Sequence, residues 1–210
     1  MPAQTLTERL YDDADTGDLD PLMLFEEWYA EAQEREPNDP HAMALATVGG
    51  DGTPDVRMVL MNARDQRGLC FFTNLESAKG TQLAANSRAA LLFHWKSLRR
   101  QVRIRGRVEP VTPTEADAYF ATRPRQSQLG AHASRQSRPL RSREELVSSV
   151  EDLDESLGPE PVNRPAHWSG FRLIPLQIEF WKDGAFRLHD RVLFTRDSAG
   201  APWRRQRLFP

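Results

Sequence analysis

The chain has 210 residues and a formal net charge of −2, with 39% hydrophobic and 28% charged residues. This length predicts one domain with a substantial core, and no apolar run approaches the roughly 20 residues that a membrane-spanning helix needs. The first twenty residues are acidic and lack the basic start and apolar centre of a signal peptide, so we expect a cytoplasmic protein.

The cysteine and histidine content argues against disulfides and metals. Cys70 is the only cysteine, so no internal disulfide can form, and its apolar surroundings predict a small buried hydrophobic side chain rather than a nucleophile. His41, His94, His132 and His167 show no metal-ligand spacing with one another or with Cys70. We therefore expect no metal site.

The N-terminal third begins with polar, aperiodic residues, and residues 1–19 predict a mobile arm before a single domain over residues 20–210. Asp20 and Pro21 form a helix start, and apolar residues then recur at helical spacing up to Pro37. Residues 41–48 predict a strand. The glycine-rich segment 49–54 predicts a turn and not a phosphate loop, since no Gly-Lys-Ser/Thr ending follows.

The stretch 56–80 predicts the centre of the fold. Residues 56–61 alternate in a strand pattern, residues 69–73 form a second apolar strand, and the polar turn between them predicts a hairpin. A helix is expected over residues 75–85. Arg57, Thr73, Ser77 and Lys79 would then converge at one end of the hairpin, where cations, hydroxyls and helix N–H groups suit a phosphate.

Residues 89–140 are rich in arginine. After a strand at 89–95, residues 101–111 predict a strand with Val102, Ile104 and Val108 on the core side, and Gly106 suggests a bulge. Thr112 and Glu115 form a capping box that begins a helix, in which Phe120 rather than Tyr119 is expected to face the interior. Residues 124–140 predict a long functional loop.

The C-terminal part is again rich in strand patterns. A second capped helix is expected over residues 142–157, followed by strands at 171–181, 186–195 and 203–208, with a hairpin turn at Asp183 and Gly184. Seven or eight strands and four short helices, joined mostly by short turns, predict an α+β protein that is mainly β: an antiparallel barrel with peripheral short helices.

Six segments occur in one order along the chain: RMVLMN, FFTNLESAKG, RRQVRIRG, YFATRPRQSQLGAHASRQS, IEFW and RLHDR. Together they resemble the pyridoxine/pyridoxamine 5′-phosphate oxidase family over about residues 20–210. The resemblance implies an FMN-binding split β-barrel and a homodimer with FMN at the subunit interface. It also implies oxidation of pyridoxamine and pyridoxine 5′-phosphates to pyridoxal 5′-phosphate, with O2 as acceptor and hydrogen peroxide as product.

The resemblance also implies roles for individual residues. The expected FMN contacts are Arg57, Met58, Val59, Leu60, Phe72, Thr73, Lys79, Gln101, Gln136, Ser137, Trp181 and Arg191. The expected substrate contacts are Asn62, Tyr119, Arg123, Ser127, Arg187, Leu188 and His189, of which Arg187 and His189 would position the substrate for catalysis. Tyr11, with Arg9, matches an N-terminal arm that folds over the active site.

Two residues depart from the family pattern, because Asn62 stands where the family usually has lysine and Ala78 where many members have arginine. Asparagine keeps a donor but loses a charge, worth about 1.5 to 3 kcal/mol in a charge-assisted bond. We expect Asn62→Lys to lower the substrate KM.

Two alternatives stay open at this stage. Asn62 favours a related split-barrel FMN oxidase with another substrate, of the phenazine-pathway type, whereas the YFATRP and RLHDR segments oppose it. The basic block over residues 96–143, with twelve lysines and arginines against three acidic residues, could instead bind nucleic acid. Its arginines are spread through strand, helix and loop and form no reading helix or stacking platform, so we expect no nucleic-acid partner.

Overall fold

The computed structural model describes residues 4–12 and 18–210. Its helices are α1 (Leu6–Tyr11), α2 (Pro21–Arg35), α3 (Ala78–Ala85), α4 (Pro113–Ala121), α5 (Arg125–Ala133), α6 (Arg143–Leu157) and the short 3-10 helix η1 (Ala185–Arg187). Its strands are β1 (Ala42–Val48), β2 (Pro54–Leu60), β3 (Ala63–Asp65), β4 (Gly68–Asn74), β5 (Arg88–Trp95), β6 (Arg100–Pro110), β7 (Trp168–Lys182), β8 (Asp190–Thr195) and β9 (Arg204–Arg207).

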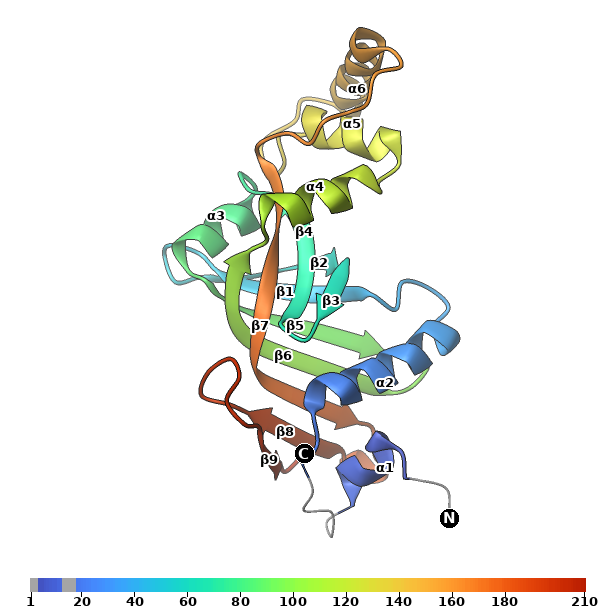
Figure 1. The fold of residues 1–210 in the computed structure, drawn as a ribbon, viewed down its shortest axis with the longest axis vertical. Helices are drawn as coiled ribbons and strands as arrows, with labels where there is room; N and C mark the ends of the chain where they lie inside the picture. The colour runs from blue at the N-terminus through green and yellow to red at the C-terminus, as the bar shows by residue number, and fades with distance from the viewer. Residues whose placement is uncertain (1–3, 13–17) are drawn as a thin grey trace.

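The strands of the described chain form one antiparallel sheet of nine, in the order β2-β1-β5-β6-β7-β4-β3, with β8 and β9 continuing from β7. The sheet curls around its core, and the predicted mainly-β fold with peripheral helices is confirmed (Figure 1). Among the described helices, none is long and apolar enough to cross a membrane.

The core lies on the inner face of the curled sheet. Ile104 of β6 is paired with Leu91 of β5 and with Ile178 of β7, and all three side chains are fully buried. Helix α2 covers this face, with the Phe25 ring 5.2 Å from Phe93 between ring centroids. The predicted alternation in β6 is therefore correct, because its apolar residues point inward and its arginines point outward.

The bulge predicted at Gly106 is confirmed. The register between β6 and β7 shifts between Arg105 and Gly106. A Cβ on Gly106 would lie 1.9 Å from the carbonyl oxygen of Ile174, so only glycine fits there. Such a bulge bends the strand and helps the sheet to curl.

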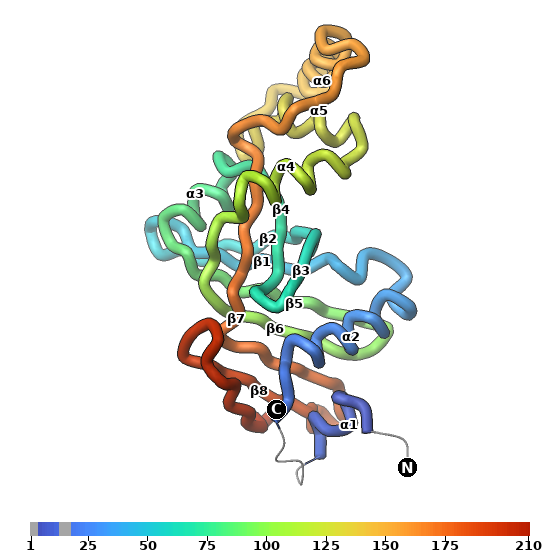
Figure 2. The backbone as a smooth tube through the Cα atoms, in the orientation of Figure 1, coloured from blue at the N-terminus to red at the C-terminus, as the bar shows by residue number. Residues whose placement is uncertain are grey.

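Helices α3, α4, α5 and α6 lie toward one end of the molecule, while α1, β8 and β9 lie at the other, and β7 runs between the two ends (Figures 1 and 2). The helical end has its own small core of Phe120, Leu129, Val162 and Trp168. As expected, Phe120 is buried and Tyr119 is only half-buried.

The segment predicted as an arm contains a helix. Helix α1 is capped by Thr5, and the carboxylate of Glu27 on α2 accepts hydrogen bonds from the backbone N–H groups of Leu6 and Thr7, each at 3.0 Å. Leu10 is fully buried in the main core. Residues 1–3 and 13–17 of the predicted arm lie outside the described residues.

The predicted hairpin between residues 56–61 and 69–73 is wrong. Strand β2 pairs with β1, because the glycine-rich turn closes tightly with the Gly49 N–H donating to the Thr53 carbonyl at 2.8 Å. Strand β4 instead pairs with β7 and with the three-residue strand β3. The polar turn before β4 therefore belongs to a shorter hairpin than the alternation suggested.

Two further expectations need correction. The loop predicted over residues 124–140 contains helix α5, whose N-terminus has no side-chain cap and so gives no start signal in the sequence. The turn at Asp183 and Gly184 is not a two-residue hairpin, since β8 pairs with β7 only from Asp190 opposite Lys182. Both capped helices, after Thr112 and after Ser142, begin as predicted.

Candidate active site

A pocket of about 700 Å³ lies between strands β2 and β4 and helices α3, α4 and α5. It is lined by the predicted FMN contacts Met58, Val59, Leu60, Phe72, Thr73, Lys79 and Gln136. The predicted substrate contacts Asn62, Tyr119, Arg123 and Ser127 line it too. The fold thus brings together residues from 58 to 136 that are distant in the sequence, and we call this cavity the helical-end pocket.

Lys79 is the cation at one side of the helical-end pocket. Its ammonium donates to Gln136 Oε1 at 2.7 Å, to Thr73 Oγ1 at 3.3 Å and to Ser77 Oγ at 3.4 Å. No carboxylate of the described chain forms an ion pair with it. Burial, and then the nearby charge of Arg57, lower the pKa of Lys79. A half-buried cation among neutral oxygens is suited to an anionic ligand.

Ser77 and Arg57 also have other hydrogen-bond partners within the chain. Ser77 is fully buried and serves as the N-cap of α3, where its Oγ accepts from the Gly80 N–H at 3.3 Å. The Arg57 guanidinium donates to Thr47 Oγ1 and to Asp55 Oδ2, each at 2.5 Å. It does not share the hydrogen bonds of Lys79, although its charge acts on Lys79.

An aromatic stack forms another wall of the helical-end pocket. The Phe72 ring stacks on Tyr119 with centroids 4.1 Å apart and on Trp168 with centroids 5.4 Å apart. Asn62 joins this wall by donating from Nδ2 to Tyr119 Oη at 2.6 Å. Burial raises the pKa of Tyr119, so its hydroxyl remains protonated at neutral pH.

Arg123 supplies the second cation of the helical-end pocket. Its guanidinium carbon lies 4.9 Å from the centroid of the Trp168 ring, which fixes the group in place. Its Nη1 is buried and has no hydrogen-bond partner in the described chain. Burial lowers the pKa of Arg123, and an unsatisfied buried donor is costly unless a ligand meets it.

Six other predicted residues, Gln101, Trp181, Arg187, Leu188, His189 and Arg191, lie toward the opposite end of β7. Gln101 is paired with Trp181 across β6 and β7, and Arg191 with Trp181 across β7 and β8. The His189 ring lies 4.7 Å from the Trp181 ring. We call this group, with Arg187 and Leu188, the β8-end cluster.

The loop that carries Arg187 is strained and exposed. Phe186 and Arg187 both have positive φ values, of 56° and 64°, which residues other than glycine rarely adopt. Phe186 and Leu188 are 94% and 71% exposed. His189 is held through Nδ1, which accepts the Gly184 N–H at 3.2 Å and lies 3.2 Å from Asp183 Oδ1, so a ligand would meet Nε2.

Within one chain the helical-end pocket and the β8-end cluster lie toward opposite ends of β7. Trp168 lines the pocket at the first residue of β7, and Trp181 lies thirteen residues along the same strand. At about 3.3 Å per residue, this is roughly 40 Å of strand. Ser137 belongs to neither group, since it lines a neighbouring hollow between α5 and α6.

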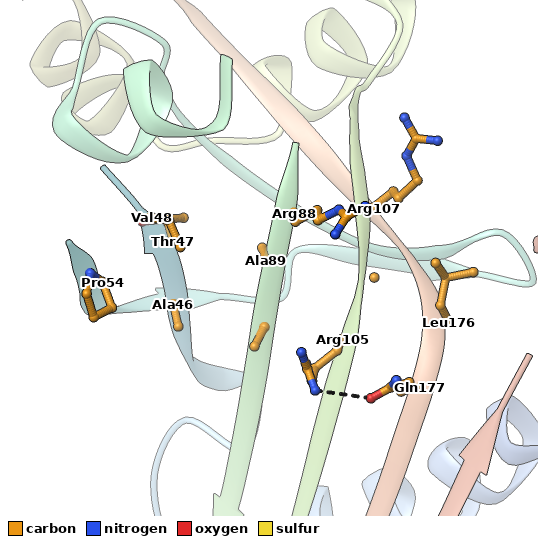
Figure 3. Close-up of a pocket in the computed structure, with 12 residues that line it drawn as sticks. Ala46, Thr47, Val48, Pro54, Arg88, Ala89, Arg105, Arg107, Leu176 and Gln177 are labelled. Atoms are coloured by element: carbon orange, nitrogen blue, oxygen red, sulfur yellow. Dashed lines mark hydrogen bonds between the residues drawn. The ribbon is translucent and has the colours of Figure 1, made fainter. Parts of the chain in front are cut away.

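A second hollow, of about 460 Å³, lies on the outer face of β1, β5, β6 and β7 (Figure 3). Arg88, Arg105 and Arg107 surround it, and Arg105 Nη1 donates to Gln177 Oε1 at 3.3 Å. It contains none of the predicted site residues. Elsewhere in the described residues, no group of three or more histidine, cysteine, aspartate or glutamate side chains could hold a metal ion.

Sequence reasoning missed Trp168 and Asn74. Trp168 completes the aromatic stack, and Asn74 lines the helical-end pocket while its Nδ2 donates to the Ser134 carbonyl at 3.3 Å. Asn74 follows directly after Thr73 and could have been proposed from that neighbourhood. Trp168 carries no such signal, because only the pairing of β7 with β4 brings it to the pocket.

The curled antiparallel sheet with its helical end defines a split-barrel protein. The solved structure of a protein from Nostoc punctiforme, described as pyridoxamine 5′-phosphate oxidase-related and FMN-binding, shares this fold, with a TM-score of 0.72 at 19% identity over 91% of this chain and 98% of that one. The structure of PhzG from Burkholderia lata 383, in complex with tetrahydrophenazine-1-carboxylic acid, superposes with a TM-score of 0.86 at 32% identity over 95% and 97% of the two chains.

Sequence comparison identifies the family. Residues 29–156 match the family described as pyridoxamine 5′-phosphate oxidase, and residues 168–210 match the C-terminal dimerisation region of pyridoxine 5′-phosphate oxidase. The pyridoxine/pyridoxamine 5′-phosphate oxidase of Azorhizobium caulinodans is 58% identical over 91% of this chain and 90% of its own length. The enzyme of that name from Nitrobacter winogradskyi is 59% identical, with the same coverage. The chain therefore belongs to the pyridoxamine 5′-phosphate oxidase family of oxidoreductases.

Proposed function

We propose that this protein is an FMN-dependent oxidase of pyridoxamine 5′-phosphate and pyridoxine 5′-phosphate, with pyridoxal 5′-phosphate and hydrogen peroxide as products and O2 as acceptor. The observation that carries the proposal is that one pocket holds two cations, Lys79 and Arg123, neither paired with a carboxylate of the described chain. Two such cations suit two phosphate groups, one on a cofactor and one on a substrate. The names of the similar enzymes agree with this reading.

The residues around Lys79 fit FMN. Lys79 supplies charge and Thr73 a hydroxyl beside it, which together suit a phosphate tail. The backbone of Met58, Val59 and Leu60 on β2 would adjoin the flavin from the same pocket. FMN, when bound, supplies the redox chemistry of the reaction, while the protein supplies orientation and electrostatics.

The residues around Arg123 fit the substrate phosphate. The Nη1 donor of Arg123 has no acceptor in the described chain, and Tyr119 and Ser127, which carry hydroxyl groups, line the same pocket. The stacked rings give the pocket an apolar wall, and an apolar surrounding strengthens the interaction of Arg123 with an anion. An unphosphorylated ring would leave this buried donor unsatisfied, so the pocket favours phosphorylated substrates.

We also propose that the active form is a homodimer. Most predicted site residues are divided between the helical-end pocket and the β8-end cluster, and every member of that cluster except Gln101 falls within the matched dimerisation region. A second copy would bring its Arg187 and His189 to the pocket of the first. Its surface would also cover the outer-face hollow of Figure 3 and the exposed side chains of Val56 and Met58.

The function is tested by measuring peroxide release from the purified protein with each phosphorylated vitamer and with its unphosphorylated form. We expect a flavin absorption spectrum and turnover of the phosphorylated compounds only. Arg123→Gln should raise the KM about 10- to 150-fold, the loss of one charge-assisted bond. Arg125→Gln is the matched control, because Arg125 pairs with Asp154 outside the pocket. Equal turnover of unphosphorylated vitamers would refute the proposal.

The shared site is tested by mixing two variants at an FMN concentration that fills the wild-type site but leaves the weakened Lys79→Met site empty. Lys79→Met disables the helical-end pocket and His189→Ala disables the β8-end cluster. Random exchange of subunits should give about half heterodimers, each with one intact site, and so restore about a quarter of the wild-type activity. No recovery after demonstrated subunit exchange would show that each site is built within one chain.

A phenazine-type substrate is the second candidate, because PhzG from Burkholderia lata 383 shares the fold at 32% identity and binds tetrahydrophenazine-1-carboxylic acid in its structure. Oxidation of that compound, without turnover of the phosphorylated vitamers, would favour it. The cytoplasmic location expected from the acidic N-terminal residues stays a prediction, which cell fractionation would check.

A further inference from the structure

Asn62 follows β2 and is held on two sides. Its Oδ1 accepts the backbone N–H of Phe72 at 3.2 Å, and its Nδ2 donates to Tyr119 Oη at 2.6 Å. Its own backbone N–H donates to the Cys70 carbonyl at 2.9 Å. The side chain is therefore fixed by the edge of β4 and by helix α4, with little freedom to turn toward a ligand.

The direction of these hydrogen bonds is determined by the backbone. The N–H of Phe72 can only donate, so the oxygen of the Asn62 amide must face it. The amide nitrogen consequently faces Tyr119 and can only donate to the phenolic oxygen. Tyr119 accepts this bond, and its own proton is left to point to another acceptor.

The surroundings of Tyr119 leave that proton one useful direction. The ring is stacked on Phe72 at 4.1 Å with an interplanar angle of 15°, so only the hydroxyl torsion remains variable. The hydroxyl belongs to the same pocket as the unpartnered Nη1 of Arg123 and as Ser127. An anion held by Arg123 would be the acceptor.

We propose that Asn62 is a positioning residue: it directs the phenolic proton of Tyr119 toward the phosphate of the substrate and does not itself bind that phosphate. This inference rests on the proposed function. It also alters the expectation drawn from the sequence, in which Asn62 was a direct substrate contact with a missing charge. In this chain the phosphate would be held by the charge of Arg123 and by oriented neutral donors.

A double-mutant cycle with Asn62→Ala and Tyr119→Phe tests the inference. Each single change should raise the KM for pyridoxamine 5′-phosphate by about threefold to tenfold, the range for one neutral hydrogen bond, with a smaller effect on kcat. The double variant should have the KM of Tyr119→Phe alone, because Asn62 then has no hydroxyl to orient. Multiplying effects would mean that Asn62 contacts the substrate directly and would overturn the inference.

Asn62→Asp provides a second test with nearly unchanged shape. Aspartate keeps an acceptor for the Phe72 N–H but would accept the phenolic proton, which turns it away from the substrate. We expect a larger rise in KM than for Asn62→Ala. Combining Asn62→Asp with Tyr119→Phe should remove the part of the rise in KM that depends on the hydroxyl and leave only the part caused by charge repulsion. An equal effect of Asn62→Asp with and without the hydroxyl would contradict the proposal.

Two controls separate this inference from a loss of folding and from failure of the proposed function. FMN affinity should change little in Asn62→Ala, because Lys79 is bonded to other residues, and a thermal midpoint that stays well above the assay temperature would exclude a loss of folding. If the wild type binds but does not oxidise pyridoxamine 5′-phosphate, the proposed function fails. The same cycle measured on the Kd of pyridoxal 5′-phosphate then decides the role of Asn62.

Discussion

Removing the charge of Lys79 should weaken FMN binding strongly while leaving the fold intact. In the structure the ammonium is hydrogen-bonded to three neutral acceptors, the nearest being Gln136 Oε1 at 2.7 Å, and it forms no ion pair with a carboxylate of the described chain. Lys79→Gln keeps a donor and much of the length of the side chain. The variant therefore isolates the charge that the proposed phosphate contact requires.

The magnitude follows from the kind of bond that is lost. A hydrogen bond to a charged group contributes about 1.5 to 3 kcal/mol, which corresponds to about a 10- to 150-fold rise in Kd. Because Lys79 is partly buried, solvent screens its charge only in part. We therefore expect the rise in the Kd of FMN to fall in the middle of the 10- to 150-fold interval. Little of the effect should come from unfolding, since Gln136 and Thr73 also bond to each other at 3.2 Å.

The assay is a titration of the apoprotein with FMN, in which the quenching of flavin fluorescence reports binding. Arg143→Gln, which removes an exposed positive charge from the start of α6, is the control for net charge. A Kd within twofold of the wild type for Lys79→Gln would refute the reasoning.

The pH dependence of FMN binding provides an independent check. Burial and the charge of Arg57 lower the pKa of Lys79, and only the protonated ammonium attracts phosphate. Wild-type affinity should therefore fall as the pH rises through that lowered value, below the pH at which an exposed lysine loses its proton. Lys79→Arg should remove the decline, because arginine stays charged.

Three further predictions concern stability and reactivity. The hydrogen bond from Arg172 holds the pKa of Glu115 at about 2. The stability that this carboxylate contributes is therefore present above its unfolded pKa and is lost as the pH falls from about 4.5 to about 2. Glu115→Gln should unfold at a lower urea concentration than the wild type near pH 7, and the difference should be smaller near pH 2. Burial raises the pKa of Cys70 to about 11, so a thiol reagent should label the native protein slowly and the urea-unfolded protein fully; fast native labelling would show that the strand opens readily. Gly106→Ala should lower the thermal midpoint by several degrees, since its Cβ would meet the Ile174 carbonyl, and an unchanged midpoint would mean that the bulge relaxes.

Local signals in the sequence determined much of the secondary structure. The capping residues Thr112 and Ser142 fixed two helix starts, and the alternation around Val102 and Ile104 fixed the buried face of β6, because these features depend on neighbours within a few residues. Helix α5 escaped prediction because it begins without a side-chain cap. The pairing of β2 with β1 was also not predicted, because an alternating pattern indicates a strand but not the strand with which it pairs.

The six ordered segments predicted the family and named the residues of the candidate site, but they could not arrange them. Pairing of β4 with β7 brings Trp168 beside Phe72 and Tyr119, and the length of β7 carries Trp181 and its neighbours to the opposite end of the molecule. The orientation of the Asn62 amide depends on a backbone N–H ten residues away. The sequence determines which side chains are present. The division of the site residues between the helical-end pocket and the β8-end cluster, and the direction of their hydrogen bonds, depend on contacts that exist only once the sheet has curled.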